Sequence, residues 1–202
     1  MKLYYRPGTC SLAAHIILHE AGFTFEIDKL DKTTQRTASG EDFTAINPKG
    51  YVPALRLDDG QVLTEGVVIL QYLADQKPES GLAPRAGTLE RYRLMEWLNF
   101  VATEIHKTFS PLFRPNITPQ LREGQLSLLA RRLDYVERHL ADKPYLMGEA
   151  FTVVDAYLFT VLNWCHNFDI DLGAWPKIKD YVARVAVRPS VRAAKKAESP
   201  TK

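Results

Sequence analysis

The chain has 202 residues, which at roughly 150 residues per domain amounts to one large domain or two small ones. Hydrophobic residues make up 46% of it and charged residues 25%, an ordinary globular composition that excludes a disordered or fibrous protein. Lysine and arginine total 26 and aspartate and glutamate 24. The resulting net charge of +2 gives no reason to expect a nucleic-acid partner.

The sequence predicts neither a membrane span nor a secretory signal. Its longest apolar runs, Gly66 to Leu70 and Ala156 to Leu162, fall well short of the roughly 18 to 20 residues that a membrane span needs. The N-terminus reaches a Pro-Gly turn before any signal-like hydrophobic stretch. We therefore expect a cytoplasmic protein, in which Cys10 and Cys165 do not form a disulfide framework.

The first part of the chain predicts a βαβ unit. Residues 2–5 form an expected strand, and a Pro-Gly turn leads into a helix that ends near Gly22. Phe23, Phe25 and Ile27 alternate with polar residues and predict a second strand. The crossover between two such strands should be right-handed. The polar stretch over residues 31–50 predicts a long loop with one short helix.

Two further strands and a helix follow. Residues 54–57 and 61–63 are joined through an Asp-Gly turn, which predicts an antiparallel hairpin. A helix opens at Glu65 and Gly66, and Pro78, Gly81 and Pro84 interrupt the pattern after it. The predicted arrangement is a small mixed sheet with helices on it, which resembles thioredoxin-like domains.

Only helical periodicity appears after Thr88. We expect a long helix over residues 89–112, a second whose apolar residues recur from Leu126 to Leu140, and a third opened by a Thr152–Asp155 capping box. Pro189 ends a further helix that starts near residue 178. A basic stripe near the C-terminus predicts a solvated helix face; its members are Arg184, Arg188, Arg192 and Lys195.

The charge balance changes along the chain in a way that supports two domains. Up to residue 80 there are 8 basic and 11 acidic side chains, and the remainder has 18 and 13. We predict an α/β domain over residues 1–80, a linker over 81–87 and an all-helical domain over 88–202.

Cys10 is the first candidate for chemistry. It stands at the start of a helix, where unpaired N–H groups and the helix dipole favour a thiolate. Residue 13 is alanine, which excludes a Cys-x-x-Cys dithiol cycle, so any thiol partner comes from outside the protein. Position alone leaves two interpretations open, a reactive thiol and a small buried residue. Cys165 lies on an apolar helical face and is interpreted as structural.

Several motifs in a fixed order resemble those of bacterial beta-class glutathione S-transferases. They are KLYYRPGTCSL at residues 2–12, NPKGYVPAL at 47–55, LTEG at 63–66, EWLNF at 96–100, EIHK at 104–107 and FTVVDAYLF at 151–159. The resemblance covers nearly the whole chain. It implies a thioredoxin-like domain followed by a helical bundle, with glutathione as co-substrate. It also implies a homodimer in which the α/β domain of one chain meets helices of the other.

Glutathione has an amine and a carboxylate, a strand-like cysteinyl unit and a thiol, and the chain offers a group for each. The Gly66 N–H can hold the carboxylate while Glu65 pairs with the ammonium, although Glu65 can equally be an acid that complements the helix dipole. Related proteins often carry Ser or Thr after this Glu. Val52 precedes Pro53 and is extended, so its main chain can pair with a peptide. The resemblance implies a cis bond there, whereas a simple entry into the strand is the alternative.

The helical domain contributes a second group of candidates. His106 lies seven residues after Asn99, with Thr103 between them, so the long helix should place the three on one side. The resemblance puts these residues, with Glu104 and Lys107, at glutathione-contacting positions and His106 next to the sulfur. A neutral or charged imidazole there can stabilise a thiolate or deliver a proton. Without the resemblance, His106 would be interpreted as a structural histidine.

Three further positions follow from the resemblance. Ser11 and Tyr5 are implied to line the glutathione site, although other classes use a Tyr near the end of the first strand to activate the thiol. Close relatives commonly carry a Lys for the glycyl carboxylate where this chain has Gln35, followed by Arg36. Either Gln35 donates a neutral hydrogen bond or Arg36 swings in. We expect weakened glutathione affinity, because a charge-assisted bond is about twice as strong.

The sequence thus predicts a transferase that joins or exchanges the glutathione thiol with small hydrophobic electrophiles or disulfides. Cys10 would form a mixed disulfide with glutathione, and His106 would assist. Conjugation, thiol–disulfide exchange and reductive dehalogenation all fit this apparatus. The alternative is a noncatalytic glutathione- or ligand-binding scaffold of the same fold. No metal site is predicted, because His15 and His19 lack further ligands.

Overall fold

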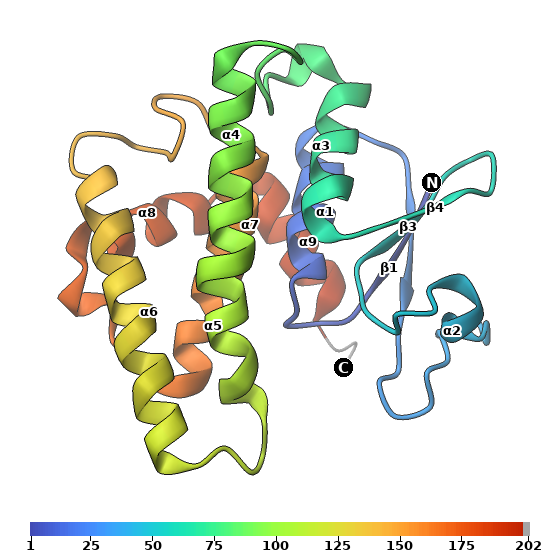
Figure 1. Cartoon of the computed structure of the whole chain (residues 1–202). Helices are drawn as coiled ribbons and strands as arrows, with labels where there is room; N and C mark the ends of the chain where they lie inside the picture. The colour runs from blue at the N-terminus through green and yellow to red at the C-terminus, as the bar shows by residue number, and fades with distance from the viewer. Residues whose placement is uncertain (200–202) are drawn as a thin grey trace. The chain divides into compact units, whose positions relative to one another are not determined.

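The computed structural model describes residues 1–199, which divide into two compact units (Figure 1). Of the described residues, one unit contains Met1–Ala83 together with residues 187–199, and the other contains Pro84–Ala186. The contacts therefore group the C-terminal helix with the first unit, whereas the division drawn from the sequence assigned it to the helical domain.

A four-stranded sheet forms the centre of the first unit. β1 (Lys2–Tyr5) pairs in parallel with β2 (Glu26–Lys29) and antiparallel with β3 (Ala54–Arg56). β3 pairs antiparallel with β4 (Val62–Thr64), so the strand order is β2-β1-β3-β4. The predicted βαβ unit, hairpin and mixed sheet are confirmed. β2 starts later than its alternating pattern suggested, because the Phe25 ring packs against α1 (Ser11–Glu20) instead of extending the strand.

Helices cover both faces of this sheet. On one face, Tyr4 and Ala54 pack with Leu30 and with Phe43 of the short helix α2 (Phe43–Ile46). Side chains alternate along a strand, so the fully buried neighbours of Tyr4 and Ala54 point to the opposite face. There α1 packs beside α3 (Gly66–Gln76), and the short 3₁₀ turn η1 (Pro78–Ser80) follows α3 (Figure 1).

The C-terminal helix α9 (Pro189–Glu198) packs along α1 in the first unit. Arg188 and Ser190 both donate to the carboxylate of Glu20. The prediction of one basic stripe on one helix is wrong, because α8 (Pro176–Ala186) ends before Arg188 and Pro189 opens a new helix. Arg188 is consequently an ion-pair partner of Glu20 and not part of a solvated face.

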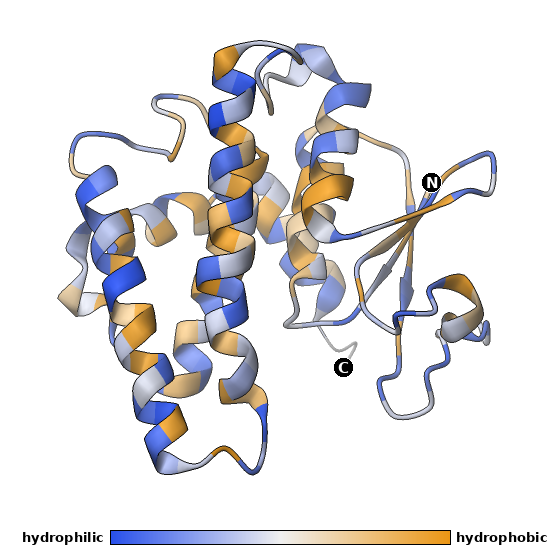
Figure 2. Ribbon diagram, viewed as in Figure 1, coloured by the Kyte–Doolittle hydropathy of each residue, from blue (hydrophilic) through white to orange (hydrophobic). Residues whose placement is uncertain are grey.

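The second unit is helical, as predicted. Its elements are α4 (Leu89–Phe100), η2 (Val101–His106), α5 (Lys107–Phe109), η3 (Ser110–Phe113), α6 (Pro119–His139), α7 (Val153–Leu162), η4 (Asn163–Phe168), η5 (Leu172–Ala174) and α8. The long helix expected over residues 89–112 is confirmed, and it changes type along its length, since η2 is π-helical and η3 is a 3₁₀ turn. α6 buries Leu129, Leu133 and Val136 while most of its other residues are hydrophilic (Figure 2).

Helix α7 begins at the predicted capping box. The Thr152 N–H donates to Asp155 Oδ2 at 2.8 Å, and the Leu146 N–H donates to Asp155 Oδ1 at 2.9 Å. All ten residues of α7 are buried, so this helix forms the centre of the second unit.

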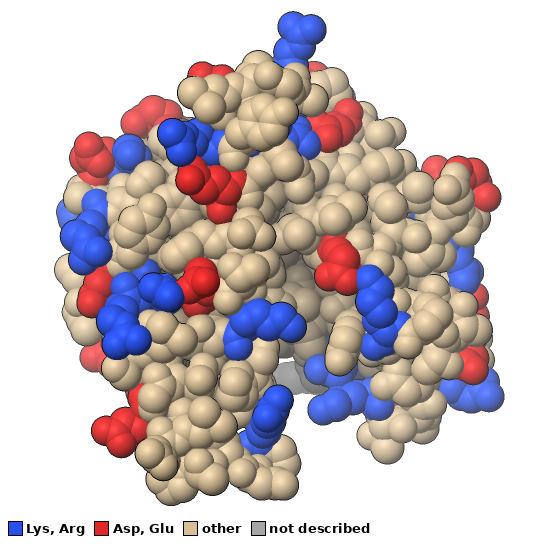
Figure 3. All heavy atoms as spheres, viewed as in Figure 1, with Lys and Arg blue, Asp and Glu red and all other residues tan. Residues whose placement is uncertain are grey.

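The described residues contain no helix that combines the length and the apolar character needed to cross a membrane. Acidic and basic side chains both occur over the face shown in Figure 3.

Candidate functional site

Cys10 and Val52, predicted to serve one site, lie side by side. Cys10 precedes α1 directly, and its half-buried thiol donates to the Val52 carbonyl oxygen at 3.4 Å. The Val52–Pro53 peptide bond is cis, as the resemblance implied. A thiol at the start of a helix therefore stands next to a main-chain carbonyl that can receive an extended peptide.

Hydroxyl groups hold the turn that presents Cys10. Ser11 Oγ accepts from the Arg6 N–H at 3.2 Å and donates to the Arg6 carbonyl at 3.1 Å. Thr9 Oγ1 lies 2.8 Å from Ser11 Oγ and donates to the same carbonyl at 2.8 Å. Ser11 is fully buried. Its hydroxyl is thus used inside the loop, where it fixes the position of the neighbouring thiol.

Glu65 and Gly66 open α3, as the sequence predicted. Glu65 has a φ of 68° and a ψ of 112°, a conformation that non-glycine residues rarely adopt and that tends to occur at functional sites. Lys49 Nζ lies 2.5 Å from the Glu65 carboxylate and 2.8 Å from Thr64 Oγ1. Sequence reasoning missed this partner, although Lys49 lies inside the motif that contains Val52 and Pro53.

Gln35 lies in the loop between β2 and α2. Its Nε2 donates to the Lys32 carbonyl at 3.0 Å, whereas its Oε1 is enclosed and has no hydrogen-bond partner among the described residues. Oε1 faces the backbone of Gly50, where an added Cβ would lie 3.7 Å away. Arg36 Nη1 donates to the Gly40 carbonyl at 3.0 Å. The Gln35 donor is therefore used within the loop, next to the segment that carries Val52.

Tyr5 is buried at the end of β1, with its ring centroid 5.9 Å from that of His15. Burial raises the pKa of the Tyr5 phenol, and the charges of Glu198 and Asp28 add to the effect. His15 Nδ1 lies 3.0 Å from the Glu198 carboxylate, and its ring stacks on His19. These contacts place Tyr5 and the two histidines in the packing of α1 with α9. Within residues 1–199, no three His, Cys, Asp or Glu side chains gather as metal ligands.

In the second unit, the candidate residues lie on or beside the π-helical segment. Short π-helical turns occur frequently at functional sites. They change the angular spacing of side chains. Glu104 pairs with Arg132 of α6 at 2.6 Å, while His106 contacts Tyr157 of α7. The remaining candidates are exposed, namely Asn99, Thr103 and Lys107.

His106 has the most defined environment of these residues. Its Nδ1 lies 2.6 Å from Tyr157 Oη, and its ring packs edge-on against Trp164 with the centroids 4.8 Å apart. Burial, with a smaller contribution from the charge of Lys107, lowers the pKa of His106 to about 4. Of the two charge states that the sequence left open, the environment favours the neutral imidazole at neutral pH.

Aromatic side chains adjoin His106. Trp164 contacts Phe109 and Phe113 with ring centroids 5.7 and 5.4 Å apart, and Phe113 also contacts Phe168 at 4.8 Å. Phe113 is 50% exposed, so part of this aromatic surface is open to a ligand. The sequence did not point to these rings as part of a ligand site. The recurrence of aromatic rings at positions 106, 109 and 113 is a signal that could have found them.

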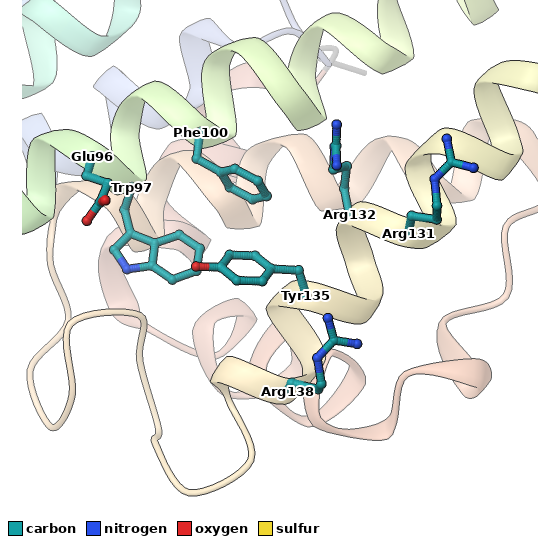
Figure 4. Close-up of a pocket in the computed structure, with 7 residues that line it drawn as sticks. All are labelled: Glu96, Trp97, Phe100, Arg131, Arg132, Tyr135 and Arg138. Carbon is teal, nitrogen blue, oxygen red and sulfur yellow. The ribbon is translucent and has the colours of Figure 1, made fainter.

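A separate hollow of about 400 Å³ lies between α4 and α6 (Figure 4). Aromatic and charged side chains line it: Glu96, Trp97, Phe100, Arg131, Arg132, Tyr135 and Arg138. The Trp97 and Tyr135 rings stack in it with their centroids 5.5 Å apart. It contains none of the site residues predicted from the sequence.

Comparison with known proteins matches both parts of the chain. The model of the glutathione S-transferase N-terminal domain matches residues 8–76, and that of the C-terminal domain matches residues 100–189. Glutathione S-transferase GstA of Escherichia coli O157:H7 is 46% identical over 98% of each chain. A beta-class glutathione S-transferase structure from Sphingomonas chungbukensis is 47% identical, with a TM-score of 0.95 over 98% of this chain and 99% of that one.

A sphingomonad glutathione S-transferase, solved as a complex with glutathione, is 45% identical and gives a TM-score of 0.95 over 98% of each chain. The chain therefore belongs to the glutathione S-transferase enzymes, in their bacterial beta class.

Proposed function

We propose that this transferase joins or exchanges the thiol of glutathione with small hydrophobic electrophiles or disulfides, and that Cys10 is its redox-active residue. The observation that carries the proposal is the 3.4 Å contact between the Cys10 thiol and the Val52 carbonyl, beside the cis bond to Pro53. A peptide that pairs with Val52 through its cysteinyl unit would bring its own sulfur to Cys10.

Glutathione would be held on both sides of its cysteinyl residue. The Gly66 N–H at the start of α3 is available to the γ-glutamyl carboxylate. The Glu65 carboxylate is available to the ammonium of the ligand, which would bind beside Lys49 Nζ or in its place. Glutathione in the related sphingomonad structure supports this co-substrate. The glycyl end would lie toward Gln35, which offers no positive charge.

Thiol exchange would proceed in two displacements. The Cys10 thiolate attacks the glutathione sulfur of a mixed disulfide, the sulfur–sulfur bond breaks, and the released thiolate takes up a proton. The product is a disulfide between Cys10 and glutathione. The thiolate of a second glutathione then attacks the glutathione sulfur of this adduct, which regenerates Cys10 and releases glutathione disulfide.

Residues of the second unit would contribute further contacts. We assign Asn99, Thr103, Glu104 and Lys107 to glutathione, and His106 to its sulfur as a neutral hydrogen-bond donor. The partly exposed aromatic rings around Trp164 would accept an aromatic electrophile. A homodimer and a cytoplasmic location remain predictions.

Parallel assays of exchange and conjugation on one set of variants test the proposal. Cys10→Ala should lose exchange with a glutathione mixed disulfide by orders of magnitude, while conjugation of glutathione to an aromatic halide persists. Cys165→Ala is the matched control and should leave both reactions unchanged, since this thiol is buried and burial raises its pKa to about 12. Unaffected exchange in Cys10→Ala would show that Cys10 is not the redox centre. Retention on immobilised glutathione without turnover of either substrate would favour the scaffold alternative.

A further inference from the structure

We propose that Tyr157 is a positioning residue that holds His106 as the tautomer with its proton on Nε2, so that His106 presents an N–H donor to the ligand sulfur. This inference rests on the proposed placement of His106 at the glutathione sulfur, and it adds a residue from another helix and a defined proton position.

The two side chains come from elements that are packed together. His106 is the last residue of η2, and Tyr157 lies in the middle of α7 and is 5% exposed. Their rings meet edge-on at 75°, with Nδ1 and Oη 2.6 Å apart. Trp164 of η4 packs against the imidazole at 72°. The ring is therefore held from two sides, and its Nδ1 is directed at one hydroxyl group.

The direction of this hydrogen bond follows from the chemistry of the two groups. A phenol O–H is more acidic than the N–H of a neutral imidazole, and the unprotonated imidazole nitrogen is a better acceptor than a phenol oxygen. Tyr157 consequently donates and Nδ1 accepts. Since Nδ1 then carries no proton, the single proton of the neutral ring is on Nε2.

The other ring nitrogen is open. His106 Nε2 makes no hydrogen bond with the described residues, and it is not enclosed, unlike the Nε2 atoms of His15 and His19. A donor at this position stabilises negative charge on sulfur, because it is oriented before the ligand arrives. The opposite tautomer would present a lone pair and would act as a base. Tyr157 thus selects between two chemical roles of one histidine.

The charge state of the ring is consistent with this selection. Burial lowers the pKa of His106, and the neighbouring ammonium of Lys107 adds to the effect. The side chains packed against the ring from α7 and η4 are Tyr157 and Trp164, neither of which carries a charge at neutral pH. Glu104 is paired with Arg132.

Nitrogen NMR of the histidine-labelled protein tests the assignment without relying on activity. Long-range proton–nitrogen correlations at neutral pH distinguish the two neutral tautomers, and His106→Gln identifies the signals. We expect Nε2 protonated in the wild type and a mixture of tautomers in Tyr157→Phe, which removes only the hydroxyl. Tyr92→Phe, the same change at an exposed tyrosine outside the site, should leave the His106 signals unchanged.

A kinetic cycle tests whether Tyr157 acts through His106. Tyr157→Phe should lower kcat for conjugation roughly tenfold with little change in KM for glutathione, and it should have no further effect in the His106→Gln background. A proton on Nδ1 in the wild type, an unchanged tautomer in Tyr157→Phe, or an equal loss in both backgrounds would overturn the proposal. The expected tautomers without a kinetic effect of either variant would instead overturn the role of His106 at the sulfur and leave the proton assignment standing.

Discussion

The Glu65 carboxylate forms an ion pair with the ammonium group of Lys49. Lys49 Nζ lies 2.5 Å from the carboxylate, with the two side chains 49% and 62% exposed. An exposed ion pair of this kind contributes about 0–1 kcal/mol, so a ligand ammonium can share or replace Lys49 at little cost. The pair therefore stabilises the charge and position of Glu65 without blocking the site proposed for glutathione.

Gly66→Ser should tighten glutathione binding. A Cβ at Gly66 would lie 3.7 and 3.9 Å from two atoms of the Pro53 ring, which is ordinary contact, and Gly66 is not among the residues with positive φ. The added hydroxyl would donate to the γ-glutamyl carboxylate, and a hydrogen bond to a charged group is worth about 1.5–3 kcal/mol. Calorimetry should show a Kd that falls about tenfold or more. Gly66→Ala adds the same Cβ without the donor, so an equal gain in both variants would contradict the assignment.

Gln35→Lys should restore a charge-assisted contact to the glycyl carboxylate. The affinity for glutathione should rise about tenfold, whereas glutathione with its glycyl carboxylate converted to a carboxamide should bind the wild type and the variant alike. Gln35→Met is the uncharged control of similar length. If the Kd values for both ligands rise or fall together, the glycyl end does not lie at Gln35.

The lowered pKa of His106 makes the stability of the protein fall in acid. The unfolded chain takes up this proton near pH 6.5, whereas burial and Lys107 lower the folded value to about 4. The unfolded state binds more protons between these values, so the free energy of unfolding decreases as the pH falls from about 6.5 to about 4. Urea titrations across this range should show a steeper loss for the wild type than for His106→Gln. Parallel curves would show that the folded and unfolded pKa values are equal.

At the scale of elements, the start of α7 depends on one buried carboxylate. Asp155 accepts from the N–H groups of Thr152 and Leu146 at 2.8 and 2.9 Å, and from the Thr152 hydroxyl at 2.9 Å. Its removal leaves three buried donors without an acceptor, and each such group costs about 1–3 kcal/mol. Asp155→Ala should therefore lower the free energy of unfolding by about 3 kcal/mol or more.

Denaturant unfolding measures this loss, and Asp171→Ala supplies a matched control. Asp171 also caps a helical turn, but it is exposed, so its replacement should cost about 1 kcal/mol or less. Equal losses in the two variants would contradict a special contribution of the buried cap.

The elements that the sequence predicted well are those whose formation depends on residues close together in the chain. The capping box of α7 and the Asp-Gly hairpin between β3 and β4 are of this kind. The π-helical segment η2 is not, because its side chains bind residues far along the chain: Glu104 binds Arg132, and His106 binds Tyr157. Local propensity contains no information about these partners, so the sequence predicted a long helix without the π-helical segment.

At the scale of the whole molecule, the first unit is assembled from both ends of the chain. Arg188 and Ser190 bind Glu20, and Glu198 pairs with His15, which lie 168 to 183 residues apart. No local pattern in α9 indicates which unit it joins, so the sequence-based division could not anticipate this grouping. The motifs indicated that Cys10 and Val52 belong together, and their side chain and carbonyl do meet. The motifs gave no indication of the side-chain partners, such as Lys49 for Glu65 and Tyr157 for His106.

Glu20→Gln should loosen the attachment of α9. The variant removes the charge that pairs with Arg188, whose side chain is only 26% exposed. We expect a loss of about 1–3 kcal/mol, which corresponds to a drop in Tm of several degrees for a protein of this size. Glu26→Gln is the control, because Glu26 is 78% exposed and lies 4.0 Å from its only ion-pair partner among the described residues, Lys2. Equal Tm values for Glu20→Gln and the wild type would contradict a stabilising role for the pair.

Mass spectrometry after incubation with glutathione disulfide tests the central claim most directly. The protein should gain one glutathione unit, located on the peptide that contains Cys10, and a reductant should remove it. Cys165→Ala should gain the same adduct, and Cys10→Ala should gain none. A wild-type protein that stays unmodified, or that carries its adduct on Cys165, would contradict the account.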